Sequence, residues 1–256
     1  MRITGFRDRM LSGTPLAGTF LKTPAFQLIE VLAQSELDFV CLDAEHAPFD
    51  RAAMDACLAI GRALDFPVLV RVGDASARET LWALDAGAVG VVVPHVDSVE
   101  KARAVARAAR FGHGGRGFAG STRWAGYATR GMGDVLAQSS TETVLIAQIE
   151  EPEAVEVAEE IAAVDGIDGL FLGPADLSVG YGFDHQNSPQ LESALRLVGE
   201  ACRAQGKTYV TFVPNAEKAA EWAKYGLTMF FIASEHTWMR AGATAQARGI
   251  HELGSD

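Results

Sequence analysis

Two acidic side chains, Glu150 and Asp176, each follow a short apolar segment. Glu150 ends the run V-L-I-A-Q-I-E at 144–150, and Asp176 ends G-L-F-L-G-P-A-D at 169–176. Each run is too short for a typical helix and predicts a buried parallel strand. If neighbouring parallel strands finish at one edge of a sheet, the two carboxylates converge there and repel each other unless a cation neutralises them. Hard divalent cations such as magnesium or manganese favour oxygen ligands, so the pair predicts a metal site.

Two further side chains could do chemistry at the same edge. His46 lies in the loop after the apolar run 39–42, and a histidine is the side chain best suited to act as a base near neutral pH. Arg71 lies inside V-L-V-R-V, where an arginine is costly unless it is paired or bound to an anion. A carboxylate or enolate oxygen would suit its fork of donors.

Each of these residues also has an ordinary interpretation. A carboxylate at a helix start, as expected for Glu150, is usually a partner of the helix dipole. Asp176 could simply cap the segment that follows it, and a lone histidine such as His46 is more often a surface or core residue. Asp85 ends a predicted helix, where it is either solvated or orients a histidine. The matching positions of Glu150 and Asp176 after consecutive strands favour a shared metal over the ordinary interpretations.

The elements that must position these residues alternate along the chain. Asp50 and Ser76 are plausible helix caps, and Gly87 and Gly206 are stop signals. About eight strand–helix units predict an α/β fold with a parallel sheet, closed into a (β/α)8 barrel that occupies residues 1–256 as one domain. Chemistry in such barrels lies at the carboxyl ends of the strands. The strands are expected at 16–20, 39–42, 67–72, 89–93, 144–149, 169–172, 208–213 and 229–233.

One segment, 111–140, interrupts the alternation. It is rich in glycine and contains scattered aromatic and arginine residues, and a loop of this length in a compact domain is usually functional or disordered. Arg116 and Arg123 within it are interpreted as ordinary surface charges. The run G-H-G-G-R-G is not a phosphate-binding fingerprint, because no strand and helix flank it in the required order. A single helix is expected at 152–163.

Composition excludes several classes of partner. The net charge of −11 and the lack of a basic cluster argue against nucleic acid. The apolar runs are far shorter than the roughly 20 residues that cross a membrane, and no hydrophobic signal segment is expected at the N-terminus.

The three cysteines, Cys41, Cys57 and Cys202, are widely spaced, which fits a reducing cytoplasm. Lys207 and Lys224 do not lie at strand ends, and no other lysine is placed at one, which argues against catalysis through a lysine Schiff base.

Five motifs in order resemble one family, the metal-dependent class II pyruvate aldolases, typified by 4-hydroxy-2-oxoheptanedioate aldolase and including 2-dehydro-3-deoxyglucarate aldolase. The similarity covers essentially the whole chain. No single motif is specific for this family. The combination is specific: Q-I-E followed by G-P-A-D-L-S, with E-H-A-P upstream. The motifs are D-A-E-H-A-P at 43–48, V-R-V at 70–72, L-D-A-G-A at 84–88, Q-I-E at 148–150 and G-P-A-D-L-S at 173–178.

The resemblance implies a barrel of the phosphoenolpyruvate/pyruvate superfamily that cleaves a 4-hydroxy-2-oxo acid to pyruvate and an aldehyde. Glu150 and Asp176 would hold a divalent cation (magnesium, manganese or cobalt). His46 would be the acid–base residue, supported by Asp85, and Arg71 would stabilise the enolate. The substrate would be bound by Gln148 and by the turn Gly173, Pro174, Ala175 and Asp176. Family members are commonly hexamers that exchange terminal helices, so a homo-oligomer is expected.

Two other functions stay open at this point. A lyase acting on a CoA thioester, from the citryl/malyl lyase branch, would need a basic nucleotide-binding patch that the sequence does not offer. A non-catalytic barrel would keep the metal and bind a keto acid without turnover. The loop at 111–140 differs in sequence from the corresponding loop of the dicarboxylate enzymes of the family. That loop faces the aldehyde half of the substrate in the family, so the sequence does not define the aldehyde.

Overall fold

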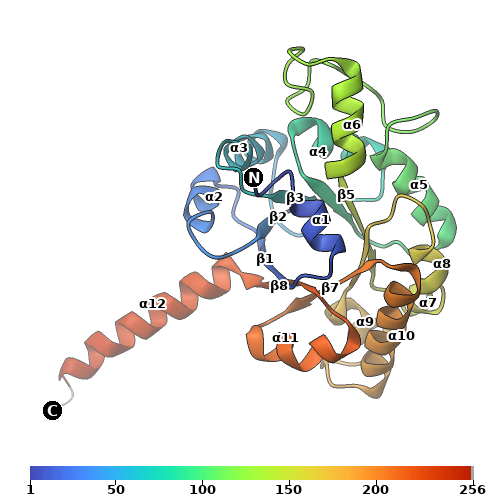
Figure 1. Cartoon of the computed structure of the whole chain (residues 1–256). Helices are drawn as coiled ribbons and strands as arrows, with labels where there is room; N and C mark the ends of the chain where they lie inside the picture. The colour runs from blue at the N-terminus through green and yellow to red at the C-terminus, as the bar shows by residue number, and fades with distance from the viewer. Residues whose placement is uncertain (255–256) are drawn as a thin grey trace.

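Eight parallel strands form a closed barrel in the order β1 to β8, which confirms the predicted (β/α)8 fold (Figure 1). The computed structural model describes residues 1–254. The strands are β1 (Leu16–Leu21), β2 (Phe39–Asp43), β3 (Val68–Arg71), β4 (Gly90–Val93), β5 (Val144–Ile149), β6 (Gly169–Leu172), β7 (Thr208–Val213) and β8 (Met229–Ser234).

Helices surround the barrel, and their caps follow the sequence signals. Asp50 accepts a hydrogen bond from the backbone of Ala53, and Ser76 accepts one from Glu79, as predicted. Gly87 and Gly206 end their helices in the left-handed region, where glycine carries no Cβ penalty. The helices are α1 (Phe6–Leu11), α2 (Phe26–Leu32), α3 (Arg51–Ala63), α4 (Ala77–Ala86), α5 (Val99–Ala109), α6 (Met132–Glu142), α7 (Pro152–Glu156), α8 (Ala158–Ala162), α9 (Pro174–Gly180), α10 (Pro189–Gln205), α11 (Ala216–Trp222) and α12 (Glu235–His251), with short 3-10 turns at Ala223–Tyr225 and Glu252–Gly254.

The core has two layers, because successive strand residues point to opposite faces. One cluster fills the barrel and includes Phe39, Cys41, Leu69, Ile146 and Phe171. The second cluster lies between the barrel and the helices and takes the alternate strand residues. At the amino-terminal end of the barrel, Phe6 and Met10 of α1 pack against the interior cluster.

Two local predictions were wrong. The segment 111–140 is not a continuous loop, because it contains α6, on which Val135, Ser139 and Glu142 are buried. Serine, threonine and glutamine make up much of this helix, so its apolar stripe is weak. The single helix expected at 152–163 is two short helices that meet at Val157, whose backbone is not helical.

The helix α12 projects away from the barrel (Figure 1), and Glu235 at its start is its one buried residue. Of the residues described, none belongs to a helix that is both long and apolar enough to cross a membrane.

Candidate active site

A cavity of about 240 Å³ opens at the carboxyl ends of the barrel strands. It combines an apolar floor, formed by phenylalanine side chains, with a rim of charged and polar groups. Most of the residues named from the sequence lie in it. The lining residues are Phe20, Lys22, His46, Arg71, Gln148, Phe171, Gly173, Pro174, Ala175, Asp176, Gln186, Phe212, Ala233, Ser234 and Thr237.

Strand alternation explains how the charged groups reach the cavity. Cys41 and Leu69 belong to the interior cluster. Two residues further along the same strands, Asp43 and Arg71 therefore also point inward, and they are register partners across β2 and β3. On β5, Gln148 lies two residues after Ile146 and points inward for the same reason. The side chains that face the barrel interior therefore change from apolar to polar at the carboxyl end of the strands.

Asp43 and Arg71 form a buried ion pair at one side of the cavity. The Arg71 guanidinium donates from Nε and Nη2 to the two Asp43 carboxylate oxygens, at 2.9 and 2.7 Å. Its Nε also lies 3.3 Å from Oε2 of Glu45. Burial alone would raise the pKa of Asp43, but the hydrogen bonds and charge of Arg71 outweigh it, and the pKa lies below its ordinary value. Both groups are therefore charged at neutral pH.

His46 lies at the mouth of the cavity, with its side chain 56% exposed. Its backbone N–H donates to Oδ1 of Asp43 at 3.1 Å, which fixes the loop after β2. Its Nε2 lies 3.7 Å from Oε2 of Glu45. The imidazole is accessible to a ligand while its backbone is held by the buried ion pair.

The two predicted metal ligands face one small space beside Gly173. A Cβ atom at Gly173 would lie 2.9 Å from Cβ of Glu150, 3.3 Å from Oε2 of Glu150 and 3.6 Å from Oδ2 of Asp176. Burial raises the pKa of Glu150; the backbone N–H and charge of His95 oppose the rise, and the charges of Asp176 and Glu45 add to it. Converging oxygens with excess negative charge are what a hard divalent cation requires, so these residues fit the ion.

His95 adds a nitrogen donor on the other side of Glu150. Its Nδ1 lies 3.0 Å from Oε1 of Glu150 and 2.6 Å from Oε1 of Glu151, and its Nε2 lies 3.3 Å from Oε1 of Glu45. Its backbone N–H donates to Oε1 of Glu150 at 2.7 Å. Ligand atoms of Glu45, His95 and Glu150 all lie within 4.8 Å of one another, so this trio is a second arrangement that could hold an ion.

Asp85 does not line this cavity, and its support of His46 stays a prediction. It belongs to α4 and pairs with the guanidinium of Arg116. Arg116 is buried and stacks on Phe111, so it is not the surface charge expected from the sequence. Arg123 also has a structural partner, since its Nη2 lies 2.8 Å from Oδ1 of Asp55. The carboxylate beside His46 in this chain is Glu45.

Sequence reasoning missed Lys22, which follows β1 and lines the cavity. The statement that no lysine lies at a strand end is therefore wrong. The predicted strand ended at Phe20, whereas β1 continues to Leu21. Phe20 is part of the interior cluster, so alternation from Phe20 to Lys22 would have revealed the inward position.

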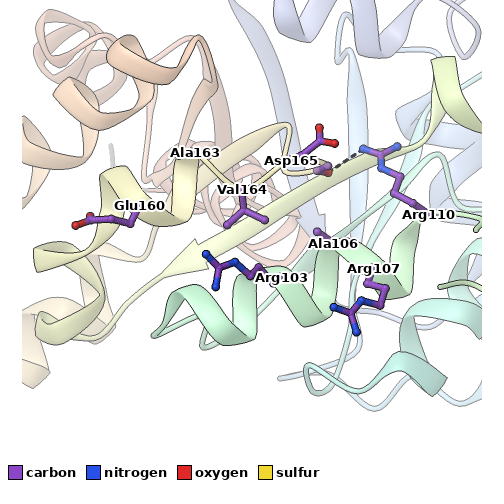
Figure 2. Close-up of a pocket in the computed structure, with 9 residues that line it drawn as sticks. Arg103, Ala106, Arg107, Arg110, Glu160, Ala163, Val164 and Asp165 are labelled. Atoms are coloured by element: carbon purple, nitrogen blue, oxygen red, sulfur yellow. Dashed lines mark hydrogen bonds between the residues drawn. The ribbon is translucent and has the colours of Figure 1, made fainter. Parts of the chain in front are cut away.

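A larger hollow of about 510 Å³ lies outside the barrel, between α5 and α8. Figure 2 shows Arg103, Arg107 and Arg110 along one side of it and Glu160 opposite. Arg110 already forms an ion pair, since its Nη2 lies 2.7 Å from Oδ2 of Asp168. None of the strand-end residues lines this hollow, so the barrel cavity is the candidate active site.

Comparison with known proteins agrees with this geometry. The family model described as HpcH/HpaI aldolase/citrate lyase matches residues 16–241. The chain belongs to this family. A family structure from Burkholderia cenocepacia superposes with a TM-score of 0.91 at 28% identity, covering 97% of this chain and 99% of the other.

Curated members of the HpcH/HpaI family confirm the resemblance to pyruvate aldolases. A hydroxypyruvate/pyruvate aldolase of Delftia acidovorans is 32% identical, over 94% of this chain and 90% of its own length. A 4-hydroxy-2-oxovalerate aldolase of Rhodococcus jostii is also 32% identical, over 88% of this chain and 87% of its own length. These relatives support the aldolase branch of the family more than the citrate lyase branch.

Proposed function

We propose that this chain is a divalent-metal-dependent aldolase that reversibly cleaves a 4-hydroxy-2-oxo acid to pyruvate and an aldehyde. The observation that carries the proposal is the single cavity lined by His46, Arg71, Gln148 and the turn from Gly173 to Asp176, with Glu150 behind Gly173. The aldolase names of the relatives support the same reaction.

Glu150 and Asp176 would hold the cation, which we expect to be magnesium, manganese or cobalt. When bound, the ion supplies a Lewis acid that polarises the keto group of the substrate. The amide of Gln148 and the backbone of Pro174 and Ala175 would orient the keto acid on this side of the cavity.

The remaining steps belong to side chains. His46 would take the proton of the C4 hydroxyl as the C3–C4 bond breaks, and Oε2 of Glu45 lies 3.7 Å from its Nε2. Arg71 would stabilise the negative charge that develops on the keto oxygen, since it is already held in place by Asp43. In the direction of synthesis, His46 returns the proton to the new hydroxyl.

The experiment is an assay for pyruvate, coupled to lactate dehydrogenase, with 4-hydroxy-2-oxovalerate as substrate. We expect pyruvate release that is abolished by a chelator and restored by added manganese. Borohydride added with pyruvate tests a Schiff base at Lys22, and we expect no covalent adduct. A chain that binds manganese but releases no pyruvate would instead be the non-catalytic barrel.

We also propose a homo-oligomer, because α12 leaves the barrel with a largely exposed surface. The three cysteines are buried as free thiols, which supports a reducing compartment such as the cytoplasm.

A further inference from the structure

Two arginines of α5 line the hollow outside the barrel and have no partner in the chain. Arg103 and Arg107 are exposed, and the guanidinium group of neither makes a hydrogen bond or an ion pair with any of residues 1–254 (Figure 2). They lie one turn apart on the same helix, so their like charges repel each other. The chain has 33 Asp and Glu residues against 22 Lys and Arg, so a shortage of carboxylates does not explain the lack of partners. An anion bound between the two guanidinium groups would remove the repulsion.

The shape of the hollow is fixed by Arg110, which follows the last residue of α5. Its Nη1 donates to the carbonyl oxygen of Thr143 at 2.7 Å, and its Nη2 donates to the carbonyl oxygen of Gly166 at 2.9 Å and to Oδ2 of Asp168 at 2.7 Å. Gly166 has a φ of 94°, and a Cβ there would lie 3.3 Å from Cβ of Ala106 on α5. The end of α5 is therefore held closely against the turn before β6, and the hollow is preformed.

The other side of the hollow carries hydrogen-bond acceptors. Glu160 of α8 and Asp165 both line it and are exposed, and neither carboxylate forms an ion pair within residues 1–254. Ala106 and Val164, which are 4% and 9% exposed, add an apolar surface to the lining. A carboxylate only accepts hydrogen bonds, so a ligand that reaches Glu160 or Asp165 must offer donors.

We propose that this hollow is a binding site for a sugar phosphate. The phosphate group would lie between Arg103 and Arg107, whose forked donors match phosphate oxygens. The hydroxyl groups of the sugar would donate to Glu160 and Asp165, and its carbon skeleton would cover the apolar surface. The volume of about 510 Å³ lies within the range of small-molecule sites, roughly 300–1,000 Å³, and exceeds what a bare phosphate ion requires.

The charges of the two sides select this class of ligand among small anions. An amino acid would supply one negative charge to the two free guanidinium groups, whereas a phosphate monoester supplies close to two at neutral pH. None of the residues that line the hollow lines the barrel cavity, so this site is separate from the proposed aldolase site and does not depend on it.

Calorimetry with glucose 6-phosphate tests the site, in buffer without metal so that the phosphate cannot bind a cation in the barrel cavity. We expect saturable binding to the wild type. Arg103→Gln/Arg107→Gln should weaken this binding about tenfold or more, because charge-assisted hydrogen bonds to the phosphate are lost. Arg78→Gln/Arg196→Gln is the control of equal charge, since it removes two exposed arginines of α4 and α10, and its affinity should match that of the wild type.

A second comparison tests the acceptor side of the hollow. The wild type should bind glucose 6-phosphate more tightly than inorganic phosphate, and glucose alone should not bind. Glu160→Ala should reduce the preference for glucose 6-phosphate over inorganic phosphate, because the inorganic ion has no hydroxyl group that reaches Glu160.

No saturable binding by the wild type, or equal affinities of Arg103→Gln/Arg107→Gln and its control for glucose 6-phosphate, would overturn the site. Inorganic phosphate that binds as tightly as glucose 6-phosphate would overturn the sugar phosphate as its ligand. The pyruvate assay decides the aldolase reaction separately, so failure of this site leaves the proposed function intact.

Discussion

Asp43 connects three functional groups at the scale of single residues. Its buried carboxylate meets the Arg71 guanidinium, the Lys22 ammonium and the backbone N–H of His46. A single side chain thus holds the proposed anion stabiliser, the lysine that lines the cavity and the loop of the acid–base residue. Asp43 belongs to the D-A-E-H motif, but its own role was not predicted from the sequence.

The depressed pKa of Asp43 predicts a pH-dependent contribution to stability. A carboxyl group whose pKa is lower in the folded chain stabilises it above the ordinary pKa, and this stabilisation is lost as pH falls through the folded value. We expect Asp43→Asn to lower the free energy of unfolding by on the order of 3 kcal/mol at pH 7, because Arg71 keeps a buried charge without its partner.

Urea titrations of the wild type and of Asp43→Asn measure this difference in the free energy of unfolding. It should begin to shrink below about pH 4, where the Asp43 carboxyl of the unfolded chain is protonated, and should be lost as pH falls further through the lower pKa of the folded chain. A difference that is constant from pH 7 to pH 3.5 would contradict the charged pair.

His46 makes a separate prediction about turnover. Its side chain is half exposed, so His46→Ala removes little packing. We expect kcat for pyruvate release to fall by about 10² to 10⁴, the usual contribution of a positioned acid–base group. Circular dichroism and the manganese affinity should match the wild type. Turnover close to that of the wild type, with metal present, would exclude His46 from the reaction.

At the scale of elements, the turn after β6 brings the two acids together. Gly173 is required for steric reasons, because a Cβ there would lie 2.9 Å from Cβ of Glu150. We expect Gly173→Ala to move the Glu150 side chain and weaken manganese binding about tenfold or more by calorimetry. Gly133→Ala on α6 is the control, since no atom lies within 4 Å of its added Cβ. Equal manganese affinity in the two variants would show that Gly173 does not shape the site.

Elements with strong apolar runs were predictable, and so were the residues that end them. Glu150, Asp176 and Arg71 could be placed at strand ends because each follows or interrupts a short apolar run, a signal that is local in the sequence. The partner of Asp85 was not predictable, because Arg116 comes from a distant loop. Lys22 was missed because the strand was predicted to end at Phe20, one residue before β1 ends. The ends of helices and strands are the part of a structure that a sequence pattern locates least accurately.

At the scale of the whole molecule, α12 leaves the barrel with exposed apolar side chains. Met239 is 61% exposed and Ile250 is 67% exposed. Such residues on a projecting helix favour packing against another copy of the chain. We expect sedimentation to give a species several times larger than the 27.2 kDa chain, and removal of residues 239–256 to reduce it.

Met239→Glu offers the same test without shortening the chain. A wild type that sediments as a 27.2 kDa monomer would refute the oligomer but not the chemistry of the cavity.

The most direct test of the central claim is the position of manganese in crystals grown with manganese and pyruvate. We expect an anomalous peak bound by carboxylate oxygens of both Glu150 and Asp176, with pyruvate beside it on the Gln148 side. A peak held by Glu45, His95 and Glu150 with Asp176 turned away, or no peak at this rim, would contradict it.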